Sequence, residues 1–173
     1  MIEHEAMLEI MQHMGFNAKW LDCIKAILSS GKSSVLLNGV PGRQFHCKSG
    51  VRQGDPLSPL LFVIDVDLLQ SVVNEMCARN ILTLPIPTSS RDYLIVQYAD
   101  DTLIVLPAVD NQLIAFKEML DIFAVSTGLR VNFSKSSLIP INMTDEEGNR
   151  VASLLGCEVG SMPFAYLGLP MGT

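Results

Sequence analysis

The sequence contains few cysteines and no cysteine motif. Cys23, Cys47, Cys77 and Cys157 are widely scattered, and no two of them have the Cys-x-x-Cys spacing of a zinc or redox site. Disulfide frameworks are typical of small secreted domains and are rare inside cells. We therefore expect four buried, reduced thiols rather than a disulfide framework or a zinc site.

Long apolar runs are also missing. The longest, residues 60–64, ends at Asp65 and is far short of the roughly 20 residues that cross a membrane. The first five residues lack the basic and apolar regions of a secretory signal. The sequence thus predicts neither a signal peptide nor a transmembrane segment, and we expect an intracellular protein, nuclear or cytoplasmic.

Positive charge is scarce. The chain has 12 Lys and Arg against 18 Asp and Glu, a net charge of −6. Proteins that bind nucleic acids normally carry a basic footprint, so any such role requires basic surfaces on segments outside this sequence. The apolar fraction of 49% over 173 residues, with a positive mean hydropathy, excludes a disordered chain and is enough for one domain with a real core.

The spacing of apolar residues predicts several helices, with identifiable ends. Asn17 and Thr144 are expected N-caps, and Gly128 suits a left-handed C-cap. The helices are expected over residues 4–14, 17–28, 58–78, 111–126 and 144–155. The side chains expected to be buried by the first two are Met7, Leu8, Met11 and Met14, then Trp20, Leu21, Ile24 and Ile27.

Hairpins are predicted between these helices. Residues 33–37 and 43–48 form one around residues 38–42, and residues 93–106 form another. A short strand is expected over 129–133, with 138–141 as its candidate partner, and a strand followed by a turn over 164–170. Loops are expected at 50–56 and 85–90. Helices interleaved with antiparallel hairpins indicate a single α+β domain over residues 1–173, with helices on one face of a sheet.

Two adjacent carboxylates, Asp100 and Asp101, lie between the apolar runs 93–97 and 102–106. Like charges repel, and a divalent cation cancels that cost, so the pair is a candidate metal site. Two carboxylates supply too few oxygens for two six-coordinate magnesium ions, so a third carboxylate is expected from another strand. The alternative is that the two aspartates only shape a hairpin turn.

The surrounding residues resemble a known family. Tyr98-Ala99-Asp100-Asp101 resembles motif C of reverse transcriptases, in the form typical of non-LTR retrotransposons and group II intron proteins. Arg52-Gln53-Gly54-Asp55-Pro56-Leu57-Ser58-Pro59 resembles motif B, residues 128–135 resemble motif D, and residues 166–172 resemble the segment next to the primer grip. These motifs occur in the family's order over almost the whole chain, and their forms are most similar to plant elements.

The resemblance implies a partial polymerase palm, with incomplete fingers and no thumb, acting on an RNA template, a DNA primer and a dNTP. Asp100 and Asp101 would hold Mg²⁺, with Mn²⁺ as an alternative, in a two-metal mechanism. Arg52, Gln53, Gly54 and Tyr98 would lie on the nucleotide and template side. From motif D, Lys135 would donate a proton to pyrophosphate, although a solvated surface lysine is the alternative.

Other residues near these motifs have structural interpretations. We expect Asp55 to begin the long helix rather than to act in catalysis. Tyr166 and Leu167 would pack under the primer terminus, or else are ordinary core residues. The three histidines have no ligand spacing and are expected to be structural or on the surface.

The family's third carboxylate comes from motif A, a strand ending in a sequence like Ala-Phe-Asp. Ile2-Glu3-His4 resembles the residues after it, which places that Asp about one residue before Met1. Glu3 and Glu5 are expected to interact favourably with the N-terminal dipole of the first helix rather than to replace the motif A Asp. We therefore expect no polymerase activity from residues 1–173 alone. The alternative is a non-catalytic remnant that acts as a binding module; the motif B match argues against a nucleotide cyclase.

Overall fold

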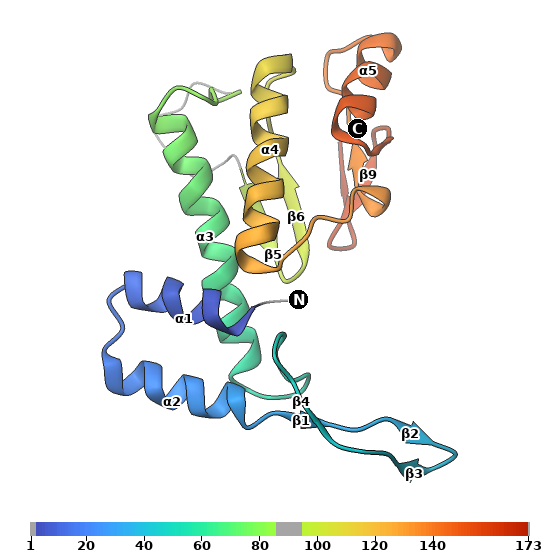
Figure 1. The fold of residues 1–173 in the computed structure, drawn as a ribbon. Coiled ribbons are helices and arrows are strands. Elements are labelled where there is room, and N and C mark those ends of the chain that lie inside the picture. The colour runs from blue at the N-terminus through green and yellow to red at the C-terminus, as the bar shows by residue number, and fades with distance from the viewer. Residues whose placement is uncertain (1–2, 86–94, 173) are drawn as a thin grey trace.

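The computed structural model describes residues 3–85 and 95–172 (Figure 1). Predicted loop residues 86–90 and hairpin residues 93–94 lie outside the described part. The helices are α1 (His4–His13), α2 (Ala18–Ser29), α3 (Ser58–Ala78), α4 (Asp110–Thr127) and α5 (Asp145–Leu155), with a 3₁₀ turn at Phe133–Lys135. The strands are β1 (Lys32–Ser33), β2 (Leu36–Leu37), β3 (Val40–Pro41), β4 (Phe45–His46), β5 (Ile95–Tyr98), β6 (Asp101–Ile104), β7 (Ser137–Leu138), β8 (Glu158–Val159), β9 (Phe164–Tyr166) and β10 (Leu169–Met171).

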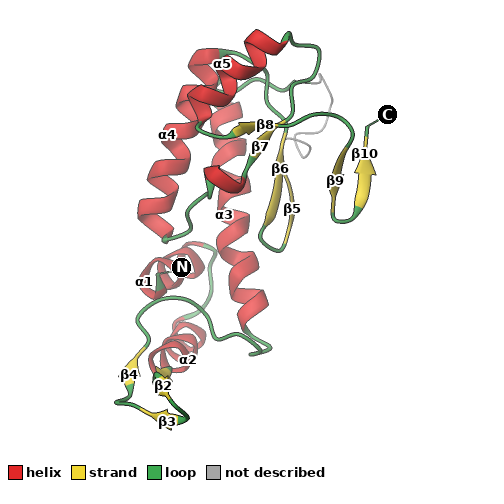
Figure 2. Ribbon diagram, turned by 90° about the vertical axis from the view of Figure 1, so that its right-hand side faces the viewer, coloured by secondary structure: helices red, strands yellow, loops and turns green. Residues whose placement is uncertain are grey.

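The strands form small two-stranded sheets rather than one continuous sheet in the described residues. The pairs β1–β4, β2–β3, β5–β6 and β9–β10 are antiparallel, whereas β7–β8 is parallel. Helices alternate with these pairs along the chain (Figure 2). The mixed α+β class is therefore confirmed. No helix in the described ranges is long and apolar enough to cross a membrane.

The core consists of two clusters of buried side chains joined by α3. Leu61 belongs to the cluster that α1 and α2 cover, together with Met7 and Met11. Further along the same helix, Leu69 belongs to the cluster that α4 and the β5–β6 hairpin cover, together with Phe116. Because α3 contributes to both clusters, it fixes the position of the hairpin relative to the N-terminal helices (Figure 1).

The β5–β6 hairpin lies with one face against α3 and α4. Ile95 is buried, and its cross-strand partner Ile104 packs against the same cluster. Side chains alternate between the two faces of a strand, so the pair Val96–Leu103 and the pair Tyr98–Asp101 point away from this core. The helices thus cover one face of this hairpin, as predicted (Figure 2).

The predicted helix ends are confirmed. The Asn17 side chain accepts a hydrogen bond from the Trp20 N–H at 2.9 Å. Thr144 and Glu147 bond to each other's backbone N–H groups in a capping box. Gly128 has φ 80° as the C-cap of α4, the left-handed conformation that glycine adopts without a Cβ penalty.

The strand predicted at residues 129–133 is wrong, and so is its pairing with 138–141. The Asn132 carbonyl accepts from the Lys135 N–H and the Ser136 hydroxyl, and the Asn132 side chain accepts from Ser134. These local bonds wind the chain into a 3₁₀ turn, because short polar side chains compete with strand ladders. Ser137 and Leu138 pair instead with β8, about 20 residues further along.

Several burial predictions also need correction. In α1, Met7 and Met11 are buried but Met14 is 51% exposed. In α2, Ile24 and Leu28 are buried, whereas Trp20 and Ile27 are each 47% exposed, because α1 covers only one narrow stripe of this outer helix. Among the cysteines, which all lie in described residues, Cys23 is exposed and the others are half-buried; no disulfide joins them.

Candidate functional site

The two aspartates occupy different positions of one tight turn. Tyr98 and Asp101 are cross-strand partners, which leaves Ala99 and Asp100 as the two turn residues. Ala99 has φ 51°, a left-handed conformation that costs a residue with a Cβ about 1–2 kcal/mol. The turn lets both carboxylates reach the same end of the hairpin, which a continuous strand would prevent.

The tip of this hairpin is open to solvent. Tyr98, Asp100 and Asp101 are all exposed, and Tyr98 is 65% accessible. In Figure 1 the turn points down toward the level of α1 and the chain's N-terminal end. Within the described residues, no group of three His, Cys, Asp or Glu side chains could hold a metal ion. The pair therefore has hard oxygen ligands for a cation, but no third carboxylate from residues 3–85 or 95–172 joins it.

The loop before α3 is held by its own side chains. The Asp55 carboxylate accepts from the Leu57 N–H at 2.9 Å, and the Ser58 hydroxyl donates to the Arg52 carbonyl at 2.6 Å. Asp55 thus organises the start of α3, as predicted, and Pro59 follows in its first turn. These bonds fix the backbone of the loop and do not involve the side chains of Arg52 and Gln53.

The remaining loop residues are available to a ligand. Arg52 and Gln53 are exposed. Gly54 has φ 85°, and a Cβ placed there would meet no atom within 4 Å, so the backbone faces open space at this point. No described hydrogen bond or ion pair joins this loop to the Asp100–Asp101 turn. The structure therefore describes two separate exposed segments.

Lys135 lies at the end of the 3₁₀ turn that replaces the predicted strand, and it is exposed. Its position comes from local bonds to Asn132 rather than from a sheet edge. Neither of the two ion pairs found in the described residues involves it.

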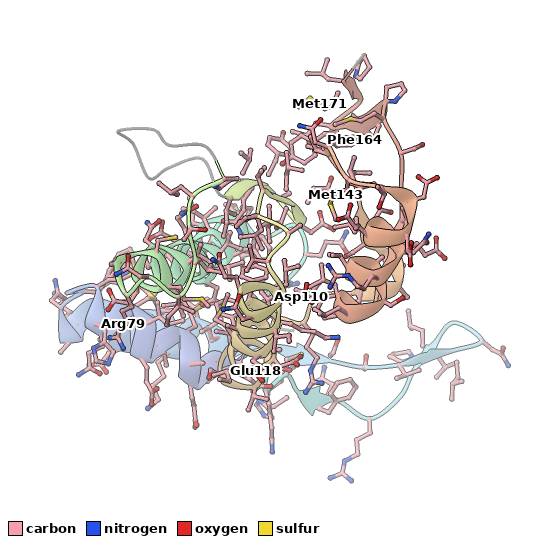
Figure 3. All side chains as sticks on the ribbon, turned by 90° about the horizontal axis from the view of Figure 1, so that it is seen from above. Arg79, Asp110, Glu118, Met143, Phe164 and Met171 are labelled. Carbon is pink, nitrogen blue, oxygen red and sulfur yellow. The ribbon has the colours of Figure 1, made fainter. Side chains whose placement is uncertain are left out.

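The terminal hairpin lies beside the aspartate hairpin. The Tyr166 hydroxyl donates to the Val96 carbonyl at 3.3 Å, which connects β9 with β5. Leu167 and Gly168 form the turn of this hairpin with φ 53° and 78°, the two positive values of a type I′ turn. At the far end, the cross-strand partners Phe164 and Met171 lie together (Figure 3). The segment resembling the primer-grip region thus contacts the strand that leads into the Asp100–Asp101 turn.

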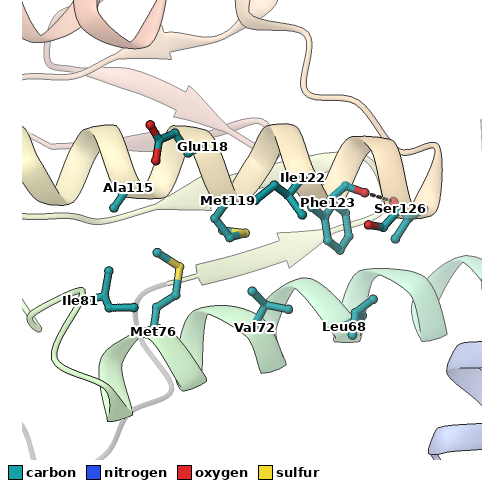
Figure 4. A pocket seen from close by; sticks show the side chains of 11 residues that line it. Leu68, Val72, Met76, Ile81, Ala115, Glu118, Met119, Ile122, Phe123 and Ser126 are labelled. Atoms are coloured by element: carbon teal, nitrogen blue, oxygen red, sulfur yellow. Dashed lines mark hydrogen bonds between the residues drawn. The ribbon is translucent and has the colours of Figure 1, made fainter.

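An apolar hollow of about 390 Å³ between α3 and α4 is not part of this site (Figure 4). Glu118 is its one charged lining residue, and none of the predicted site residues lines it. Its other lining residues are Leu68, Val72, Met76, Ile81, Ala115, Met119, Ile122, Phe123, Ser126 and Thr127. An apolar lining gives neither metal ligands nor contacts for a phosphate.

His4 has a structural role, as one of the two expected alternatives, although its partner was not predicted: its Nε2 donates to the Gly50 carbonyl at 2.7 Å, which ties α1 to the chain leading into the loop before α3. Sequence reasoning missed one residue. Asp65 in α3 is fully buried, and neither carboxylate oxygen has a hydrogen-bond partner. Burial raises the pKa of Asp65 to about 7. The available signal was the single acidic residue on the apolar stripe Leu61, Asp65, Leu69 of a helix.

Comparison with known proteins matches residues 1–171 to the family described as "Reverse transcriptase (RNA-dependent DNA polymerase)". The chain is 31% identical over 74 residues to the "Retrovirus-related Pol polyprotein from type-1 retrotransposable element R2" of Popillia japonica, covering 43% of this chain and 12% of that protein. It is 24% identical over 163 residues to the "Retrovirus-related Pol polyprotein from type-2 retrotransposable element R2DM" of Drosophila melanogaster, covering 92% and 14%. It is also 24% identical over 136 residues to the "Transposon TX1 uncharacterized 149 kDa protein" of Xenopus laevis, covering 79% and 10%. The chain thus spans 10–14% of the length of these relatives.

Proposed function

The chain belongs to the reverse transcriptase (RNA-dependent DNA polymerase) family, and we propose that residues 1–173 form part of the palm of an RNA-directed DNA polymerase of a non-LTR retrotransposon. The observation that carries this proposal is the turn that presents Asp100 and Asp101 together at the exposed end of a hairpin. The motif forms favour a plant-type element. The substrates would be an RNA template, a DNA primer and a dNTP.

The carboxylates of Asp100 and Asp101 suit Mg²⁺ or Mn²⁺, which prefer oxygen ligands. Asp100 lies in the turn and would be the stronger ligand, with Asp101 as the weaker one. When bound, two such ions would activate the primer 3′-hydroxyl and neutralise the triphosphate during in-line displacement. Because the described residues supply only two carboxylates here, a complete site requires a third from motif A.

The exposed segments around the turn would position the other reactants. Arg52 and Gln53 present donors that fit phosphate oxygens or base edges, and Gly54 lets a nucleotide approach the backbone closely. Tyr98, beside Asp101 on the open face of the hairpin, would contact the nucleotide or template. Lys135 would protonate or electrostatically stabilise the leaving pyrophosphate.

A second candidate is a binding module without catalysis. It is favoured by one observation: the aspartate pair is not joined by a third carboxylate in the described residues. Such a module would not couple metal binding to nucleotide binding, because the coupling requires a cation shared between carboxylates and the triphosphate.

Calorimetric titration separates these candidates. If Asp100 and Asp101 share a cation with a dNTP, Mg²⁺ and dNTP each bind more tightly in the presence of the other, and Asp100→Asn abolishes this coupling. Asp121→Asn, an exposed aspartate on α4, is the matched control and should retain it. No coupling in the unaltered chain would favour the binding module. Primer extension on a primed RNA template should show no incorporation by residues 1–173 alone.

A further inference from the structure

The positive charge of the chain is concentrated in one segment. Residues 23–54 contain five of the 12 Lys and Arg and none of the 18 Asp and Glu. This corrects the expectation that basic surfaces lie only on segments outside the sequence. The described ion pairs are Arg79–Glu75 and Arg150–Asp110, so no basic side chain of residues 23–54 is neutralised by an ion pair.

This segment includes a slender arm, residues 31–48, that projects away from the helices (Figure 1). The strand pairs β1–β4 and β2–β3 form it, and Asn38-Gly39 closes it with φ 49° and 80°. All its residues are exposed except three that are half-buried, Gly31, Ser34 and Cys47. Nothing else in the described chain covers the arm.

Two of the arm's three Lys and Arg residues, Lys32 and Lys48, lie at its base, and Arg43 lies between β3 and β4. Lys32 and His46 are cross-strand partners, and the Cys47 N–H donates to the Gly31 carbonyl, which extends the pairing by one residue. Lys48 comes two residues after His46, so it lies on the same face as Lys32. The chain then runs from Lys48 to Arg52 in four residues. The basic face of the arm is therefore continuous with the motif B loop.

The opposite face of the arm is less polar. Phe45 is the cross-strand partner of Ser33, and it is 52% exposed. Cations that bind phosphates, together with an exposed aromatic ring on which bases stack, are the combination used for single strands. A buried protein contact would instead favour a surface without unpaired lysines, which are depleted at interface cores.

We propose that this arm, together with the loop up to Arg52, holds the phosphate backbone of a single nucleic-acid strand, namely the RNA template on its way to the Asp100–Asp101 turn. The proposal rests on the proposed polymerase function. It adds a surface, since Lys32, Lys48 and Phe45 belong to none of the motif residues placed at the reaction site.

Fluorescence anisotropy with a short, labelled, mixed-sequence RNA tests the proposal. The double variant Lys32→Gln/Lys48→Gln should bind more weakly by roughly tenfold at about 50 mM salt. Its plot of log affinity against log salt should be less steep by about 1.4, or about 0.7 for each phosphate that the variant no longer neutralises. Phe45→Leu should weaken binding without changing that slope, because stacking releases no counterions.

The matched control is Lys19→Gln/Arg79→Gln, which removes the same charge from exposed positions on α2 and beside the end of α3. It should leave the slope unchanged. Equal effects of the two double variants would overturn the proposal, as would no measurable RNA binding. A labelled single-stranded DNA of the same sequence represents the primer, and a loss of affinity confined to DNA would show that the arm holds the primer and would contradict the proposal.

The test is independent of the reaction site. Asp100→Asn should retain the full RNA affinity and slope, while losing the coupling of Mg²⁺ to dNTP. In this variant, loss of the coupling with arm-dependent RNA binding intact would support both proposals. No coupling in the unaltered chain, with arm-dependent RNA binding intact, would contradict the proposed reaction site but not the role of the arm. Self-association that depends on Phe45, with RNA affinity indifferent to Lys32 and Lys48, would show that the arm docks protein and would contradict the inference.

Discussion

The hydroxyl of Tyr166 donates a hydrogen bond to the backbone carbonyl of Val96, 3.3 Å away and 70 residues earlier in the chain. Val96 lies in the strand that leads into the aspartate turn, on the face turned away from the core. This bond connects the terminal hairpin to β5 without any shared strand pairing in the described residues. The segment that resembles the primer-grip region is thereby held beside the strand that leads to the two aspartates.

Tyr166→Phe removes this connection. Because the bond is long and partly exposed, we expect a loss of about 0.5 kcal/mol in the free energy of unfolding. The larger effect is local: amide exchange in β9–β10 should accelerate, while exchange in β5–β6 stays slow under its helices. Hydrogen exchange followed by NMR measures both. Tyr98→Phe is the control, because the Tyr98 hydroxyl has no described partner; equal acceleration in both variants would contradict this role of Tyr166.

Asp65 makes the stability of the fold depend on pH. Its pKa rises from 3.8 in the unfolded chain to about 7 in the folded one, because burial disfavours the charged form. Below about pH 4 the Asp65 carboxyl group is protonated in both the folded and the unfolded chain, so its burial carries no electrostatic penalty. As pH rises toward 7 the unfolded chain ionises first, so stability falls, by up to about 4 kcal/mol, and then stays level. Urea unfolding between about pH 4 and 8 measures this loss.

The variant Asp65→Ala should abolish this part of the pH dependence. At about pH 8 it should raise the free energy of unfolding by roughly 2–4 kcal/mol, less the small cavity it leaves. Near pH 4 the same variant should not raise the free energy of unfolding. Asp67→Ala is the matched control on the exposed side of α3 and should change little at either pH. A pH-independent effect of Asp65→Ala would show that packing, not ionisation, decides its contribution.

The strained turn residue Ala99 gives a prediction at the candidate site itself. Glycine adopts φ 51° without a Cβ penalty, although it loses more entropy on folding. Ala99→Gly should therefore raise the free energy of unfolding by about 0.5–1 kcal/mol. Ala108→Gly, in an exposed loop without positive φ, should lower it. Thermal unfolding of the two variants compares them directly; a loss in both would show that the turn is not strained.

Local signals in the sequence predicted much of the fold. Asn17, Gly128 and Thr144 marked helix ends because caps depend on side chains within a few residues. The Asp100–Asp101 hairpin followed from two apolar runs around a turn. The strand predicted over residues 129–133 is wrong because Asn132 bonds to the residues just after it. The pairing predicted for residues 138–141 is wrong because the parallel partner of β7 is distant in the chain and begins only at Glu158.

The sequence predicted which residues make up the candidate site, but not how they are arranged in space. The types and order of the motif residues identified the family, which the match over residues 1–171 confirms. The roles of Lys135, Arg52 and the aspartates stay predictions. The bond from Tyr166 to Val96 depends on which elements pack together, and no local pattern encodes that. The apolar stripe around Asp65 indicated that its carboxylate would be buried, but not that it would lack a partner.

The most direct test of the central claim is the broadening of backbone amide signals by Mn²⁺, a paramagnetic stand-in for Mg²⁺, in NMR spectra of residues 1–173. If Asp100 and Asp101 are the metal ligands, low Mn²⁺ should selectively broaden the amides of residues 98–101, and Asp100→Asn/Asp101→Asn should abolish this effect. Broadening that centres on the acidic first turn of α5, or that survives in the double variant, would contradict the account.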